Sequence, residues 1–113
     1  MEVWLPLRTW SEPNLRTHWA PRARRVRQQR GAARLLVRAA FAAHGRPATP
    51  RSVALTRIAP RALDSDNLAA ALKAVRDGVA DALGMDDGDP RLIWRYDQGR
   101  GRPKEYAIVV EVS

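Results

Sequence analysis

Aspartates are concentrated in one segment of an otherwise basic chain. Residues 61–90 contain seven aspartates against three basic residues, whereas the whole chain has a formal net charge of +8. Asp64 and Asp66 precede a predicted helix, and a second pair, Asp86 and Asp87, follows it. Clustered carboxylates without neighbouring His or Cys are typical of a site for Mg²⁺, or for Mn²⁺ in its place, rather than for zinc. The pattern therefore indicates a hard divalent cation.

A structural role for the same aspartates is the competing interpretation. One aspartate before a helix caps its free N–H groups and gains from the helix dipole. Lys73 can pair with Asp77 one turn later, and residues 86–89 can form a solvated turn. However, a cap needs only one carboxylate. Asp64 and Asp66 lie two residues apart, so an extended backbone there would point both side chains the same way.

The two acidic pairs are predicted to be too far apart to meet within one chain. A helix over residues 66–83 is roughly 26 Å long, so Asp87 reaches Asp66 only if the chain doubles back. The few residues before Arg91 barely allow that return. Two copies with antiparallel helices would instead bring the pairs together. We therefore predict a homodimer with two composite metal sites, whose ligands are Asp64, Asp66, Asp86 and Asp87.

The elements that must position these aspartates follow from hydrophobic periodicity. Strands are predicted over residues 2–8, 51–59, 91–97 and 105–112, and helices over 22–43 and 66–83. Residues 9–22 are predicted to form a loop, and residues 98–104 a hairpin loop between the last two strands. The order β-α-β-α-β-β predicts a single α+β domain over residues 1–113, with two main helices on a small mixed or antiparallel sheet.

The buried faces of these elements can also be predicted. The first helix should bury Val26, Ala33, Leu36, Val37 and Ala40, and the second Leu68, Leu72, Val75, Val79 and Leu83. In the strand over residues 51–59, the alternation of Val53 and Leu55 is predicted to break at Arg57 and to resume at Ile58.

The basic residues are as unevenly distributed as the acidic ones. Residues 1–60 carry 12 arginines against two glutamates, which suggests that this region holds a polyanion. A genome rich in arginine codons would explain the preference for Arg over Lys, but not the clustering of the acids. The chain has no cysteine, which excludes disulfides and thiolate-zinc sites and fits a reducing cytoplasm. No apolar run is long enough to span a membrane.

The segment from residue 64 to residue 87 resembles the core motif of the RusA-type Holliday-junction resolvases. In that family Asp-x-Asp-Asn-Leu leads into a helix with a lysine, an aspartate one turn later and a glycine near its end, followed by Asp-Asp. The likeness extends more loosely to the basic first helix and to an early strand followed by a Pro-Asn loop, here Pro13-Asn14. The matching residues in the core motif are Asp64-Ser65-Asp66-Asn67-Leu68, Lys73, Asp77, Gly84 and Asp86-Asp87.

This resemblance implies a function. Members of the family are small α+β dimers that use Mg²⁺, without an organic cofactor, to cleave four-way DNA junctions in recombination and repair. It implies a cytoplasmic endonuclease of a bacterium, its prophage or a phage, with Asp64, Asp66 and Asp87 matching the catalytic aspartates. Lys73 matches the active-site lysine with a shift, because it follows Asp66 by about one helical turn more than in the family.

Basic side chains are predicted to contact the DNA backbone. They are Arg24, Arg25, Arg27, Arg30, Arg34 and Arg38 in the first helix, and Arg100, Arg102 and Lys104 near the hairpin loop. A solvated helix face is the alternative for the first group. Trp10 and Trp19 either stack on unpaired bases or pack at the edge of the core. His18 and His44 are expected to be surface residues.

Two further functions are compatible with the sequence. One is a non-catalytic nucleic-acid-binding protein whose aspartates are structural. The other is a nuclease of the same fold that acts on flaps or other branched DNA.

Overall fold

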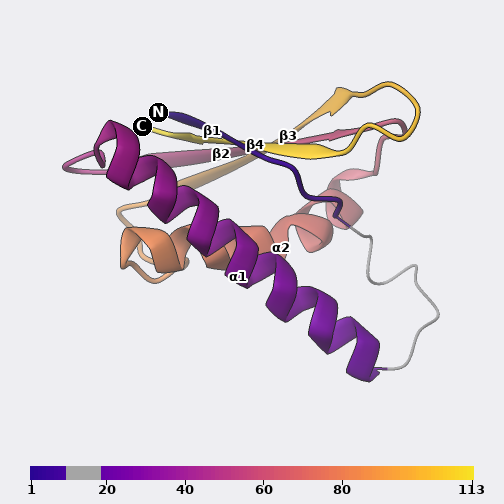
Figure 1. Cartoon of the computed structure of the whole chain (residues 1–113), viewed down its shortest axis with the longest axis horizontal. Helices are drawn as coiled ribbons and strands as arrows, with labels where there is room; N and C mark the ends of the chain where they lie inside the picture. The colour runs from indigo at the N-terminus through magenta and orange to yellow at the C-terminus, as the bar shows by residue number, and fades with distance from the viewer. Residues whose placement is uncertain (10–18) are drawn as a thin grey trace.

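The computed structural model of the chain describes residues 1–9 and 19–113. The elements occur in the order β1 (Glu2–Leu5), α1 (Trp19–His44), β2 (Ser52–Ala59), α2 (Ser65–Leu83), β3 (Ile93–Arg100) and β4 (Ala107–Val112). Both helices lie on the same side of one four-stranded sheet, and the two termini lie together at one end of it (Figure 1). This arrangement confirms the predicted α+β class with two helices and a mixed sheet.

The sheet has the strand order β1-β4-β2-β3. The β2 strand is parallel to β3 and antiparallel to β4, and β1 is antiparallel to β4. The predicted hairpin of the last two strands is therefore wrong, because β2 lies between them. The physical reason is that α2 acts as a crossover, which returns the chain to pair β3 in parallel with β2. The loop at 101–106 then carries the chain past β2 to the opposite side.

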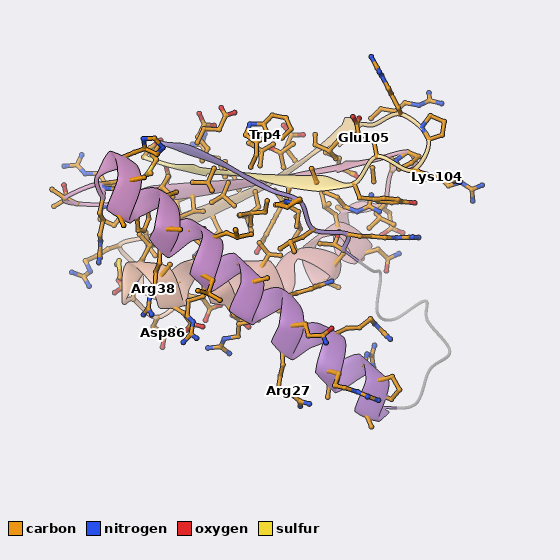
Figure 2. The ribbon with its side chains drawn as sticks, viewed as in Figure 1. Trp4, Arg27, Arg38, Asp86, Lys104 and Glu105 are labelled. Carbon is orange, nitrogen blue, oxygen red and sulfur yellow. The ribbon has the colours of Figure 1, made fainter. Side chains whose placement is uncertain are left out.

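The core lies between the sheet and the helices. Ile108, Val110 and Val112 of β4 are buried in it. In β2 the alternation does not break: Arg57 is itself buried, and Ile58 lies on the opposite face, which corrects the prediction for this strand. The outer face of the sheet carries Trp4, whose side chain is 61% exposed and points away from the helices (Figure 2).

The first helix is longer than predicted, and the face that it buries differs from the predicted one. The helix begins at Trp19, so residues 19–22 are helical and not part of a loop as predicted. Pro21 does not prevent this, because proline is tolerated in the first turn of a helix. Trp10, Pro13-Asn14 and His18 lie outside the described residues. Ala33, Val37 and Phe41 are buried, whereas Val26 and Leu36 are each 37% exposed. The N-terminal end of α1 extends beyond the sheet (Figure 1).

The second helix agrees closely with the prediction. All five residues of its predicted stripe are buried. Within residues 1–9 and 19–113, no helix is long and apolar enough to cross a membrane.

Candidate metal and nucleic-acid site

The N-terminal end of α2 is capped by Asp64. The backbone of Asp64 is extended (φ −68°, ψ 167°), and its Oδ1 accepts a hydrogen bond from the Asn67 N–H at 2.9 Å. The helix begins at the next residue, Ser65, so the extended pair that would point Asp64 and Asp66 the same way is not formed. Asp66 instead lies in the first helical turn, where the helix dipole stabilises its negative charge.

Neither carboxylate of this pair is neutralised by a basic side chain within residues 1–9 and 19–113. Asp64 and Asp66 are both exposed, and within the described part of the chain neither forms an ion pair with Lys or Arg. Asp64 uses Oδ1 in the cap, and no described residue donates a hydrogen bond to its Oδ2. The pair therefore offers carboxylate oxygens to a cation from solution.

The segment before this pair is held by a residue that the sequence analysis did not single out. Gln98 on β3 accepts a hydrogen bond from the Leu63 N–H at 2.9 Å and donates one to the Leu63 carbonyl at 2.6 Å. These two bonds fix the backbone one residue before Asp64, at the carboxyl ends of the parallel strands β2 and β3. Open α/β sheets commonly bind ligands beyond this edge. Only the alternation along β3 could have indicated Gln98, by placing its side chain on the helix side.

The C-terminal end of α2 brings the second acidic pair back along the helix. Gly84 adopts the left-handed conformation (φ 67°, ψ 29°), which glycine favours at a helix C-cap, and its N–H bonds to the Ala80 and Asp81 carbonyls. The chain then doubles back, so that Asp87 Oδ2 lies 2.8 Å from Lys73 Nζ. The chain therefore does return along α2, because the left-handed cap reverses its direction at Gly84, but Asp87 is brought to Lys73 rather than to Asp66.

The returning segment is fixed through the main chain of Asp87 as well as its carboxylate. Its carbonyl accepts hydrogen bonds from Arg76 Nη2 at 2.9 Å and from Trp94 Nε1 at 2.8 Å. Arg76 Nε lies 3.1 Å from Asp87 Oδ2, in an ion pair without hydrogen-bond geometry. The guanidinium of Arg76 also stacks over the Trp94 ring and donates to Tyr96.

Cations neutralise the aspartates at this end. Lys73 donates to Asp77 at 2.7 Å as well as to Asp87, and these bonds raise the pKa of Lys73. The hydrogen bond from Lys73 lowers the pKa of Asp87. Arg30 of α1 makes a two-point contact with Asp81, at 2.7 and 2.9 Å, which lowers the pKa of Asp81.

These residues surround an acidic hollow of about 240 Å³, lined by Arg30, Asp77, Ala80, Asp81, Met85, Asp86 and Asp87. Asp86 lines it while its Oδ1 accepts the Gly88 N–H at 2.8 Å. Nevertheless, no three acidic or histidine side chains in residues 1–9 and 19–113 are grouped so as to hold a metal ion. Lys73 and Arg30 occupy the positions next to these carboxylates that a metal would take.

The four predicted metal ligands are therefore not brought together within one chain. Asp87 contacts Lys73, which is two helical turns, or about 10 Å, beyond Asp66. Asp64 and Asp66 alone fit the modest demand of Mg²⁺, which is commonly bound by one or two carboxylates, substrate phosphates and water. Asp64 and Asp66 are thus exposed carboxylates at one end of α2, whereas Asp77, Asp81 and Asp87 are paired with Lys73 or Arg30 towards the other end.

The predicted DNA contacts fall into three groups. Arg24 and Arg27 are exposed on the part of α1 that projects from the sheet, and Arg27 points away from the rest of the molecule (Figure 2). Arg25 is half-buried and has an interaction partner. Arg30, Arg34 and Arg38 lie nearer the acidic hollow, where all three lower the pKa of Asp81. The third group is exposed around the loop after β3 and consists of Arg100, Arg102 and Lys104.

Comparison with known proteins gives one informative match. A protein of Xylella fastidiosa strain Temecula1, described as "Uncharacterized protein", is 42% identical over 79 residues, which cover 66% of this chain and 52% of that protein. The chain thus spans about half the length of this relative. No family model matches the chain. The search of solved structures returned no match.

Proposed function

We propose that the protein is a Mg²⁺-dependent endodeoxyribonuclease of the RusA-like type, which hydrolyses phosphodiesters at four-way DNA junctions. The observation that carries this proposal is the absence of any ion pair on Asp64 and Asp66, within the described residues of a chain with 20 basic side chains. Asp64 and Asp66 are exposed and lie two residues apart in the sequence, so their negative charges disfavour one another unless a cation lies near them. In a basic protein that leaves this pair unneutralised, a divalent ion is the natural partner.

Each residue at this site has a distinct role in the proposed reaction. Asp64 and Asp66 would hold Mg²⁺, which when bound supplies an activated water and neutralises charge on the phosphate. The cap bond to Asn67 fixes the orientation of the Asp64 carboxylate, and Gln98 fixes the backbone before it. Lys73 lies beside Asp87 and holds that carboxylate in place, so its proposed role is to position Asp87 rather than to contact the scissile phosphate directly.

The third carboxylate is proposed to come from a second copy of the chain. Within the described residues of one chain, Asp64, Asp66 and Asp87 do not form a group that could hold a metal ion, and Asp87 is instead paired with Lys73, seven residues beyond Asp66. A two-fold dimer with antiparallel α2 helices would place Asp87 of one copy near Asp64 and Asp66 of the other. Two such sites suit a substrate that itself has near two-fold symmetry, as a four-way junction does.

A second candidate function follows from the other end of α2. Asp77, Asp81 and Asp87 are all in ion pairs and Asp64 is a helix cap, so each of these aspartates has a structural role. A non-catalytic protein that binds nucleic acid through its arginines would need no more than this.

Cleavage of a synthetic four-way junction distinguishes the two candidates. With Mg²⁺ the wild type should cleave the junction, and Asp66→Asn should abolish cleavage while binding persists. The matched control is Asp81→Asn, which removes a carboxylate from the same helix at a site paired with Arg30 and should leave cleavage intact. Binding that is indifferent to Mg²⁺, with no cleavage by the wild type, would establish the non-catalytic alternative. Cleavage of flaps in preference to junctions would identify the other branched-DNA nuclease.

Mixing two inactive variants tests the composite site. If each site combines two chains, a heterodimer of Asp66→Asn with Asp87→Asn contains one intact site, and re-equilibrated mixtures should recover a substantial fraction of the activity. If each site lies within one chain, every site in the mixture is damaged and no activity returns. A mixture of Asp66→Asn with wild type at the same total concentration calibrates the expected recovery.

A further inference from the structure

Arg57 is a charged residue in the interior of the protein. Its side chain belongs to the helix-facing side of the central strand β2, and the residue is only 8% exposed. Its Nε donates to Thr9 Oγ1 at 3.2 Å and its Nη1 to the Arg61 carbonyl at 2.8 Å. Both acceptors are neutral, and no hydrogen bond from Nη2 reaches any described residue. Among the described residues no carboxylate forms an ion pair with Arg57.

Such a charge is unfavourable without an anion. Burial lowers the pKa of the Arg57 guanidinium, and the positive charge of Arg8 lowers it further, while Tyr106 acts in the opposite direction. Buried charges in folded proteins are normally paired, because transfer from water into the protein is costly. The chain has 12 acidic side chains, yet none of those in the described regions lies close enough to Arg57 to affect its pKa. A ligand anion would remove this cost.

The space beside Arg57 is suited to such an anion. A hollow of about 250 Å³ opens here, and we call it the arginine hollow. It is roughly eight times the volume of one water in the liquid, which is ample for a phosphate group. Arg8 also stacks on the ring of Tyr106, 4.3 Å from its centroid. The charged residues that line the arginine hollow are all arginines. The principal lining residues of the hollow are Arg8, Thr9, Arg57, Arg61, Leu63 and Tyr106.

We propose that the arginine hollow binds a phosphate group of the DNA backbone and so holds the strand beside the Asp64–Asp66 pair. This inference rests on the proposed function for the identity of the substrate, but the anion site itself does not depend on catalysis. Arg61 lines the hollow three residues before Asp64, so their Cα atoms are at most about 10 Å apart. A phosphate in the hollow would therefore lie within a few nucleotides of a metal at the aspartates, since one strand rises about 3.4 Å per nucleotide.

The geometry favours phosphate because of the donor type. A guanidinium presents a planar set of N–H groups that matches two phosphate oxygens at once, and such charge-assisted bonds are stronger than neutral ones. Free phosphate and backbone phosphate share this chemistry, so the test must separate them.

The anion site is tested first with inorganic phosphate and the full chain. Thermal melting is followed in sodium phosphate and in sodium chloride at equal ionic strength, without divalent metal. Phosphate should raise the wild-type melting temperature above its value in chloride, because a ligand that binds only the folded state stabilises it. In Arg57→Gln the rise should fall to the smaller, general stabilisation that a kosmotropic anion gives any folded protein. In the matched control Arg95→Gln, an exposed arginine that follows Trp94 on β3 and faces away from the core, the rise should remain. An equal rise in Arg57→Gln would overturn the proposal.

Junction binding in EDTA then tests whether the phosphate is that of DNA. Arg57→Gln should weaken binding about tenfold, the effect of losing one charge-assisted contact, whereas Arg95→Gln should change it far less. Normal junction affinity in a variant that has lost the phosphate response would show a site for free phosphate only, and would reject the DNA assignment. If Arg57→Gln does not fold, Arg61→Gln and Arg57→Lys serve in both assays. Because neither assay reads cleavage, a failure here is distinct from inactivity of the nuclease, and Asp66→Asn should behave as wild type in the phosphate assay.

Discussion

The two ends of α2 carry the same residue type in opposite electrostatic situations. At the N-terminus, Asp64 and Asp66 form no ion pair with any described residue, whereas at the C-terminal half Asp77, Asp81 and Asp87 are each paired with Lys73 or Arg30. The helix dipole contributes to the difference between Asp66 in the first turn and Asp81 in the last turn, because it stabilises anions at the N-terminus and destabilises them at the C-terminus. Asp81, in the last turn of α2, is accordingly paired with Arg30, while Asp64 and Asp66 at the N-terminal end form no ion pair with a described residue.

The first helix supplies part of this neutralisation. Arg30 reaches Asp81 because α1 and α2 pack closely at Gly78, where a Cβ atom would collide with the Arg30 carbonyl oxygen and lie 2.8 Å from Ala33 Cβ. The missing side chain at Gly78 thus determines the distance between the arginine face of α1 and the acidic residues of α2.

The largest expected effect comes from separating the helices. Gly78→Ala should lower the free energy of unfolding by about 1–3 kcal/mol, because the added methyl group forces two packed backbones apart. Urea denaturation measures this loss directly. The variant should also weaken the contact between Arg30 and Asp81. Asp81 would then be less neutralised, and the two ends of α2 would differ less in the pairing of their aspartates.

Gly31 provides the matched control for this substitution. It lies in α1, and a Cβ atom there would meet nothing within 4 Å. Gly31→Ala should therefore leave stability unchanged or raise it by up to about 1 kcal/mol, as expected for replacing glycine within a helix. Equal destabilisation by the two substitutions would show that the close approach at Gly78 is not what holds α1 against α2.

An intermediate effect is expected from removing one paired carboxylate. Asp87→Asn should cost about 1 kcal/mol at neutral pH, since its partners Lys73 and Arg76 are partly exposed and solvent weakens their ion pairs. The pKa of Asp87 is lower in the folded state than its ordinary value of 3.8, so the unfolded chain binds more protons below neutrality. The stability it contributes is present above pH 3.8 and is lost as pH falls through the folded pKa.

The pH dependence provides the check on this prediction. Urea denaturation midpoints of wild type and Asp87→Asn should differ at pH 7 and converge as the pH falls below 3.8, because the wild-type carboxyl is then protonated as well. A difference that persists undiminished in strong acid would mean that the amide disturbs packing rather than removing a charge.

The contrast between the ends of α2 also shows what the sequence could predict. The buried stripe, the glycine cap and the β-α-β-α-β-β order follow from local periodicity and from residue types with fixed backbone preferences, and the structure confirms them. The strand order does not follow, because β3 pairs with β2 only through the α2 crossover and local alternation favours a hairpin with β4 equally well.

The candidate site was predictable only in part. The Asp64 cap and the pair of Lys73 with Asp77 follow from helical spacing. The return of Asp87 to Lys73 does not, because it depends on the reversal at Gly84 and on the hydrogen bonds from Arg76 and Trp94. The burial of Arg57 could not be predicted either, because hydrophobic periodicity assigns charged residues to the surface. Its hydrogen-bond acceptors are Thr9, which is distant in sequence, and the Arg61 carbonyl, which lies beyond the end of the strand.

The smallest effect on stability is expected at the N-terminal end. Asp66→Asn removes a charge that no basic side chain in the described part of the chain neutralises, so only a helix-dipole contribution is lost and the free energy of unfolding should change by less than about 0.5 kcal/mol. Its effect should appear instead with metal. Mn²⁺ should raise the melting temperature of the wild type and of Asp81→Asn, but not that of Asp66→Asn, because binding to the folded state alone stabilises it. If Asp66→Asn proves as destabilising as Asp87→Asn, the carboxylate at position 66 is held by the protein itself and is not available to a cation, and the distinction between the two ends of α2 fails.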